Sequence, residues 1–198
     1  MTVLAEPKPK PKLMSIDEFM AMPDSVGHEL VEGVLTERKL MGALSNWVAA
    51  QIVLHLGAFV RSGGIGHIFL SETTYRCFGH PNTGRRPDVS FIRRGRLPGE
   101  QIPLGYVDIP ADLAIEVVSP TDLAYEIEEK VRLYLDNGFG EVWVVYPNTR
   151  TMHIHRKGEP SLSLGLSDVL IGRGPLDGFA CPVAEQFPVG QEAQPVNP

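Results

Sequence analysis

The chain has 198 residues and a formal net charge of −6, with 43% hydrophobic and 21% charged residues. This length and composition are typical of one soluble globular domain with a substantial core. The sequence has no run of about 18 uncharged apolar residues, so we expect no membrane-spanning helix and no membrane partner. The acidic balance argues against a general nucleic-acid-binding surface, because phosphate contact favours basic surfaces.

Cysteine usage and the two ends of the chain suggest how it is organised. Cys77 and Cys181 form no CxxC pair, which fits a reducing compartment, and we expect no structural zinc site based on thiolates. Residues 1–14 predict a flexible Lys/Pro-rich arm without an apolar signal core, so we expect a cytoplasmic protein. We expect a single domain over residues 15–180 and a flexible tail over residues 181–198.

The first predicted elements are a short helix, a hairpin and a long helix. A capping box at residues 15–18 starts the short helix, and residues 28–39 alternate around the turn pair Glu32-Gly33 and predict a β-hairpin. Residues 42–64 predict a long helix. We assign its buried face to residues at helical spacing, namely Leu44, Trp47, Val48, Gln51, Leu54 and Ala58.

The second half of the chain predicts most of the sheet. Strands are expected at residues 66–78, 87–92, 111–120, 141–147 and 151–156, with a helix at 121–138 capped by Thr121 or Asp122. The strand–helix–strand order around residues 112–146 implies parallel pairing there. We therefore predict an α/β fold of the mixed α+β kind, in which a central mixed β-sheet is flanked by helices.

Two acidic side chains lie in strands that the pattern would bury. Asp88 follows Pro87 at the start of an apolar strand, and Glu116 shares one face of another apolar strand with Ala114 and Val118. A buried lone carboxylate is costly unless it is paired, protonated or bound to a metal. Two acids on neighbouring strands can together bind a hard divalent cation through oxygen, so we expect them to hold Mg²⁺, with Mn²⁺ as a substitute.

Lys130 lies at the edge of the apolar stripe of the helix that directly follows the Glu116 strand. A lysine there can run its stem along apolar surface and place its ammonium group beside the two acids. A metal held by the acids would bind a phosphate oxygen and lower the pKa of an attacking water. The ammonium would orient that water and stabilise negative charge on the phosphorus.

Several segments together resemble a known family. RRPDVSF, LAIEVVSP and EEKVRLYLDNGFGEVWVVYP, with HELVEG upstream, resemble the Uma-two family, bacterial proteins classed as restriction endonucleases of the PD-(D/E)XK superfold. The resemblance covers roughly residues 15–156 and implies a restriction-endonuclease-like fold. It places Asp88 at the Pro-Asp position and Glu116 at the acidic position of the next strand.

The sequence departs from the superfold at one position. Val118 stands where the superfold has a lysine, and the resemblance implies that Lys130 replaces it from the helix. Glu29 matches an additional acidic residue of such nucleases, and Glu32 is its rival because the hairpin register is open.

Each of these residues also has a simpler structural interpretation. Asp88 could merely begin a strand after a proline, Glu116 could be a core acid paired with an arginine, and Lys130 could form a surface pair with Glu126. Arg85 and Arg86 could contact phosphates or belong to a solvated loop. Trp47 and Trp143 lie in apolar runs and are expected in the core rather than stacked on bases.

The leading hypothesis is a metal-dependent endonuclease that acts on DNA, without a small organic cofactor. Its catalytic residues would be Asp88, Glu116, Lys130 and Glu29, and a homodimer could act on both strands. The alternative is a catalytically inactive protein of the nuclease fold that serves as a nucleic-acid or protein binding adaptor. The acidic net charge and the missing strand lysine favour this alternative.

Overall fold

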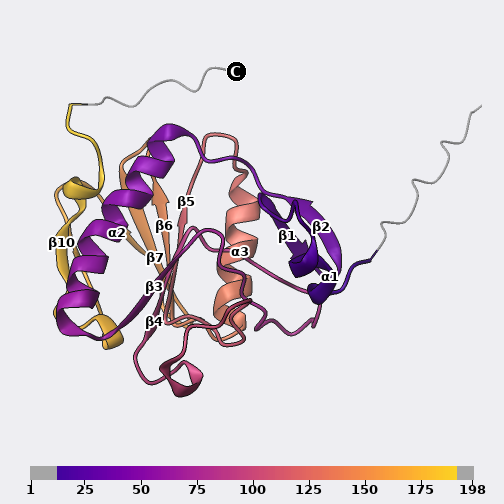
Figure 1. Cartoon of the computed structure of the whole chain (residues 1–198). Coiled ribbons are helices and arrows are strands. Elements are labelled where there is room, and N and C mark those ends of the chain that lie inside the picture. Colours follow the sequence, from indigo (N-terminus) through magenta and orange to yellow (C-terminus); the bar gives the residue numbers. More distant parts are fainter. Residues whose placement is uncertain (1–12, 191–198) are drawn as a thin grey trace, which may run out of the picture.

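A six-stranded sheet with a helix on each face forms the centre of the computed structural model, which describes residues 13–190 (Figure 1). The sheet order is β3-β4-β5-β6-β7-β8, with bounds Gly66–Leu70, Val89–Arg93, Leu113–Val117, Glu141–Tyr146, Thr151–Arg156 and Leu162–Leu164. Most of the predicted arm, residues 1–12, and the last residues of the predicted tail, 191–198, lie outside the described residues. The predicted mixed sheet flanked by helices is confirmed.

The pairing of the strands is antiparallel except at the centre of the sheet. β5 and β6 pair in parallel, with Leu113 opposite Glu141, and α3 (Ala124–Asp136) connects them. This arrangement is the predicted crossover unit. The other pairs, β3–β4, β4–β5, β6–β7 and β7–β8, are antiparallel.

The two faces of the sheet carry separate apolar cores. Ile115 and Val117 of β5 pack with the fully buried Trp143 on the α2 face, where α2 spans Ala43–Gly63. Ala114 of β5 packs with Ile127 on the α3 face. Because strand side chains alternate, Glu116 points to the α3 face, as the sequence predicted.

The predicted buried face of α2 is wrong in part. The helix buries Ser45, Val48, Ile52, Leu56 and Val60, whereas Trp47 and Leu54 are 41% and 62% exposed. Periodicity could not select the correct face, because no residue from 43 to 60 is charged and apolar side chains occur on every side. Trp47 is therefore not a core residue.

α2 also bears on the expectation of no membrane partner. Among the described residues it is the helix whose length and mean hydropathy of 1.5 would allow it to cross a membrane, and 28% of that window is buried inside the protein. The core helices of soluble proteins pass the same test of length and hydropathy, so the expectation stays a prediction.

A small subdomain next to α3 carries the hairpin. It contains α1 (Ile16–Ala21), β1 (His28–Val31) and β2 (Val34–Glu37) (Figure 1). The predicted capping box is confirmed, since Ser15 Oγ accepts from Glu18 N at 3.2 Å and Glu18 Oε2 accepts from Ser15 N at 2.7 Å. The predicted turn is confirmed at Glu32 and Gly33, which both have positive φ.

The hairpin is attached to the segment before β4. Leu30 and Gly84 exchange two backbone hydrogen bonds, of 3.0 and 2.7 Å. A Cβ at position 84 would lie 2.7 Å from Ile16 Cδ1 and 3.0 Å from Thr74 Cγ2, so a larger residue there would require these two side chains to shift. The attachment holds β1 beside the start of β4.

The C-terminal segment packs into the core where the sequence predicted a tail. β9 (Val169–Ile171) pairs with β10 (Ala180–Pro182), and a 3-10 turn, η3, follows at Val183–Gln186. Cys181, Val183 and Phe187 are buried with the α2 core, so the packed structure continues well past residue 180. The apolar residues here stand singly among Pro and Gly, and therefore show no period.

Two element boundaries also differ from expectation. The strand expected at 66–78 ends at Leu70, after which Tyr75 forms only isolated bridges with Arg85 and Val107. Neither Thr121 nor Asp122 caps α3, whose N-cap is Leu123. Asp122 instead accepts a hydrogen bond from Ser119 N at 2.7 Å in the preceding turn.

Leu56→Ala tests the observed face of α2. Leu56 is fully buried, so its truncation should lower the free energy of unfolding by about 2–5 kcal/mol, measured by urea titration. Leu104→Ala is the control, because Leu104 is fully exposed and its loss should change stability by less than about 0.5 kcal/mol. Equal losses in the two variants would contradict the observed packing.

Candidate active site

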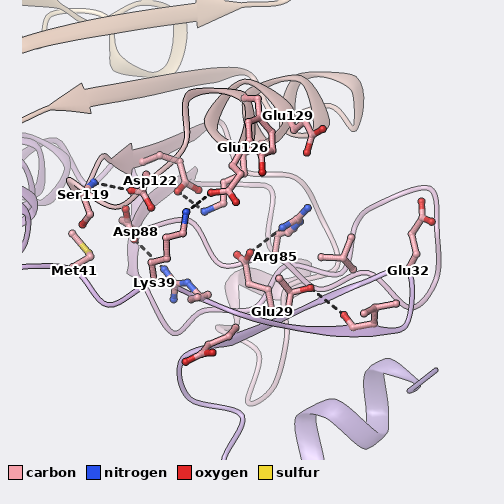
Figure 2. A pocket seen from close by; sticks show the side chains of 18 of the residues that line it. Glu29, Glu32, Lys39, Met41, Arg85, Asp88, Ser119, Asp122, Glu126 and Glu129 are labelled. Atoms are coloured by element: carbon pink, nitrogen blue, oxygen red, sulfur yellow. Dashed lines mark hydrogen bonds and ion pairs between the residues drawn. The ribbon is translucent and has the colours of Figure 1, made fainter. Parts of the chain in front are cut away.

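A pocket of about 850 Å³ opens between the β1–β2 hairpin, the adjoining ends of β4 and β5, and α3 (Figure 2). Five of the predicted residues line it, namely Glu29, Arg85, Asp88, Glu116 and Lys130. Lys39, just after β2, bridges to Glu126 of α3 with a 2.5 Å ion pair at one side of the pocket. Elements far apart in sequence therefore build a single site.

Asp88 and Glu116 converge because of the strand register. β4 pairs with β5 so that Val89 lies opposite Ile115, and one step further Asp88 faces Glu116 on the same side of the sheet. Val117 N donates to Asp88 Oδ2 at 2.8 Å, which ties the carboxylate to β5. Both side chains are buried.

Glu116 is held by two residues of α3. Lys130 Nζ donates to Glu116 Oε2 at 2.8 Å, and the Tyr134 hydroxyl donates to Glu116 Oε1 at 2.8 Å. Lys130 and Tyr134 are four residues apart and so lie on one side of the helix. The predicted reach of Lys130 is observed. The sequence did not reveal Tyr134 as a site residue, because its hydroxyl group gives no signal in a periodicity pattern.

The protonation states of Lys130 and Tyr134 follow from their surroundings. Burial acts to lower the pKa of Lys130, but the carboxylates of Glu116 and Glu29 outweigh it and raise the pKa above its ordinary value. Burial and the Glu116 carboxylate raise the pKa of Tyr134 well above its ordinary value. Lys130 therefore stays charged and Tyr134 stays protonated, so both act as donors to Glu116 at neutral pH.

Arg38 is a site residue that the sequence did not reveal. It follows β2, and its Nη2 lies 3.0 Å from Asp88 Oδ1 while its Nη1 donates to Ser71 O at 3.0 Å. Its guanidinium group is the cationic partner of Asp88. A basic residue at the end of a charged hairpin is ordinary surface composition, so only the folded hairpin brings Arg38 to the strand.

The structure separates Glu29 from its rival Glu32. Glu29 is 2% exposed, accepts from Arg85 Nη1 at 3.0 Å and from Arg86 N at 2.8 Å. Glu32 is exposed at the hairpin turn, away from the Glu29–Arg85 pair (Figure 2). Burial acts to raise the pKa of Glu29, but the charges of Lys130 and Arg85 outweigh it and lower the pKa. Glu29 is therefore the buried, ionised acid of this region.

The two arginines expected at phosphates have different surroundings. Arg85 lines the pocket while it pairs with Glu29. The Arg86 guanidinium is turned away beneath the hairpin, where it contacts Glu72 Oε2 and Ser25 O at 2.8 Å each and Thr74 Oγ1 at 2.9 Å. Of the two arginines, only Arg85 lines the pocket, and the contacts of Arg86 are structural.

Asp88 is the pocket carboxyl group whose pKa is raised most clearly toward neutral pH. Burial, together with the negative charge of Glu116, raises the pKa of Asp88 to about 7, although Val117 N, Lys130 and Arg38 act in the opposite direction. In the absence of another cation, Asp88 thus gains a proton near neutral pH. A divalent cation at this position would remove the repulsion between the two carboxylates.

The donor set fits a hard divalent cation. Asp88 and Glu116 offer carboxylate oxygens on one face of the sheet, which Mg²⁺ and Mn²⁺ prefer. Each carboxylate oxygen has two lone pairs, so the hydrogen bonds from Lys130 and Arg38 leave capacity for a metal. The lining also contains Glu32, Glu37, Asp122, Glu126 and Glu129, and acidic side chains outnumber basic ones. The pocket as a whole therefore favours cations.

Fold and site together define a nuclease-like protein. A family model, Uma2, described as "Putative restriction endonuclease", matches residues 16–184. The chain belongs to the Uma2 family, which confirms the resemblance found in its motifs. No curated protein matches the chain.

A solved structure shows the same fold. A protein from Anabaena variabilis ATCC 29413, described as "a putative nuclease belonging to DUF820", superposes with a TM-score of 0.74. The match covers 87% of this chain and 97% of that chain at 18% sequence identity. The restriction-endonuclease-like fold is thereby confirmed.

Asp88→Asn tests the protonation of the buried acid. Because the pKa of Asp88 is raised to about 7 from about 3.8, the native state binds the extra proton, and this stabilising contribution is lost as pH rises through about 7. The unfolding free energy of the wild type, relative to Asp88→Asn, should fall between pH 4 and pH 7. Urea titrations of both proteins in metal-free buffer across this pH range measure the difference in unfolding free energy. If that difference rises with pH, the raised pKa of Asp88 is wrong.

Proposed function

We propose that this protein is a metal-dependent endonuclease that hydrolyses phosphodiester bonds in DNA, with Asp88 and Glu116 as ligands of Mg²⁺ or Mn²⁺. The observation that carries the proposal is the β4–β5 register, which puts both carboxylates on one side of the sheet inside the pocket. Membership of a family described as restriction endonucleases supports it. A bound cation would supply Lewis-acid polarisation of a phosphate oxygen and a lower pKa for a bound water.

The side chains of the pocket have separate roles in this proposal. Lys130 remains protonated, so it cannot accept a proton; it orients the attacking water and stabilises negative charge on the phosphate. Tyr134 holds the second oxygen of Glu116, and Arg38 holds Asp88, so both are positioning residues. Glu29 fixes Arg85 at the wall of the pocket, where the guanidinium faces an incoming phosphate.

DNA as the substrate and a homodimer as the assembly are further parts of the proposal. The acidic lining repels a polyanion, so cation binding must precede DNA binding. A two-fold dimer requires one patch that contacts itself. We assign this dimer contact to the exposed apolar stripe of α2, which consists of Trp47, Ala50, Leu54 and Ala58.

The adaptor remains the alternative, and one observation favours it. Each buried acid of the site already has a cationic partner within the protein: Lys130 for Glu116, Arg38 for Asp88 and Arg85 for Glu29. A balanced set of this kind is satisfied without a metal. An inactive protein would keep these ion pairs for stability and use the pocket for binding alone.

Plasmid nicking in Mg²⁺ or Mn²⁺ separates the two proposals. Asp88→Asn removes a ligand charge and Lys130→Met removes the ammonium, so each variant should lower the nicking rate by at least about 100-fold. Lys157→Met is the matched control, because Lys157 pairs with Asp136 at the surface and lies outside the pocket. It should nick at the wild-type rate.

The outcomes of this experiment are distinct. Nicking that needs a divalent cation and is lost in both site variants supports the endonuclease. A wild-type protein that binds the cation and DNA but never nicks supports the adaptor. Nicking that persists in Asp88→Asn and Lys130→Met would exclude this pocket as the active site. Sedimentation velocity on the same samples reports whether the chain is a dimer.

Cation affinity should depend on pH. A metal competes with the proton on Asp88, so the affinity for Mn²⁺ should rise roughly tenfold per pH unit below 7 and level off above it. Isothermal calorimetry between pH 5.5 and 8.5 measures the dependence and the proton release. In Asp88→Asn the slope should vanish together with most of the affinity. A wild-type affinity independent of pH would show that Asp88 is not a ligand.

A further inference from the structure

A second group of potential metal ligands lies where the C-terminal segment meets α2, on the other face of the sheet from the pocket. His55 comes from α2, Cys181 from β10 and Glu185 from η3, and one ligand atom from each lies within 4.8 Å of the others. Figure 1 shows β10 alongside α2. The group is independent of Asp88 and Glu116, which approach α3.

The distances within this group suit a tetrahedral ion. His55 Nε2 lies 3.4 Å from Glu185 Oε2, and Cys181 Sγ lies 4.0 Å from the same oxygen. Zinc bonds of about 2.0 Å to nitrogen or oxygen and about 2.3 Å to sulfur place neighbouring ligand atoms roughly 3.3–3.5 Å apart. The His55–Glu185 spacing already matches, Cys181 needs to approach the Glu185 oxygen by only about half an ångström, and the His55 and Cys181 ligand atoms lie within 4.8 Å of each other.

The Gln186 side chain packs directly against this group. Its side chain is 1% exposed, and its Nε2 lies 3.0 Å from His55 Nδ1 and 2.9 Å from Cys181 Sγ. Its Oε1 is buried and has no hydrogen-bond partner among the described residues. An unsatisfied buried amide oxygen is costly, which favours the opposite orientation of this carboxamide group.

Rotation of the Gln186 carboxamide group would satisfy that oxygen and prepare the histidine. The rotated oxygen must also move away from Cys181 Sγ, because the present amide nitrogen lies 2.9 Å from that sulfur, and an oxygen there would repel a thiolate. Oε1 could then accept a hydrogen bond from a proton on His55 Nδ1. This tautomer leaves His55 Nε2 unprotonated beside Glu185, as metal binding requires. Metal-binding histidines usually donate their other ring N–H to an oxygen of this kind, which fixes the ring orientation.

We propose that His55, Cys181 and Glu185 bind one Zn²⁺ ion, with a water as fourth ligand, and that the ion fastens the C-terminal segment to α2. The mixed nitrogen, sulfur and oxygen set selects zinc over the magnesium-class cations of the pocket. This site revises the sequence-based expectation of no thiolate zinc site. Spacing along the chain could not show it, because Cys181 follows His55 by 126 positions.

The segment that the ion would fasten reaches the core through single apolar side chains spaced along it. Cys181, Val183 and Phe187 pack onto the α2 core, while much of the surrounding chain is exposed. Because Zn²⁺ would bind the folded protein and not the unfolded chain, it should raise the stability of the protein by mass action. The effect on the nuclease pocket should be small, since the sheet lies between the two sites.

Cobalt(II) substitution tests the site without reference to activity. The full-length protein, stripped of metal, should bind one Co²⁺ per chain and show a near-ultraviolet band from the bond between cobalt and the thiolate. Added Zn²⁺ should abolish that band. The band should persist in Cys77→Ser, the matched control, because Cys77 lies outside the group, and should be absent in Cys181→Ser.

Two further measurements keep the test decisive. If Cys181→Ser does not fold, Glu185→Gln changes a half-exposed ligand that folding does not require, and it should weaken Co²⁺ binding at least about tenfold. Zn²⁺ should raise the melting temperature of the wild type and of Cys77→Ser but not of Cys181→Ser. A wild-type protein with no thiolate band, or a band that survives in Cys181→Ser, would overturn the proposal. These outcomes are independent of plasmid nicking.

Discussion

The burial of carboxylates between two strands and a helix is the constraint on which the site depends. Asp88 and Glu116 are placed opposite each other by the β4–β5 ladder, and Val117 N donates to Asp88 across it. Each buried charge would cost several kcal/mol if left alone. The fold meets this cost with the cations Lys130 and Arg38, brought by α3 and by the end of the hairpin.

This constraint explains the layered organisation of the chain. On the α3 face, a polar site occupies the end of the sheet where β4 begins and β5 ends, and aliphatic and aromatic side chains fill the rest. On the α2 face the sheet is covered by apolar side chains, to which the C-terminal segment adds Val183 and Phe187. The hairpin closes the pocket through the Leu30–Gly84 backbone pair, so that Glu29 and Arg38 reach the strands.

The predictable part of the molecule is the part with strong local periodicity. The crossover around residues 112–146 was found because a short apolar strand, an amphipathic helix and another apolar strand follow in order. Lys130 was found because its angle on the helix follows from its position relative to Ile127. The buried face of α2 was missed because a helix that is apolar all round gives no preferred direction. The C-terminal core residues were missed because they are isolated.

The sequence by itself determined the three helices and the strands from β1 to β7, and it placed an acid in each of two buried strands, because alternation and helical period are local properties of the chain. Only the tertiary structure decided which cation pairs with which acid, that Glu29 rather than Glu32 is buried, and that Arg86 turns away from the pocket. It also brought His55 to Cys181 and Glu185. These choices depend on strand register and on how the hairpin and the C-terminal segment pack, and such long-range contacts leave no pattern in neighbouring residues.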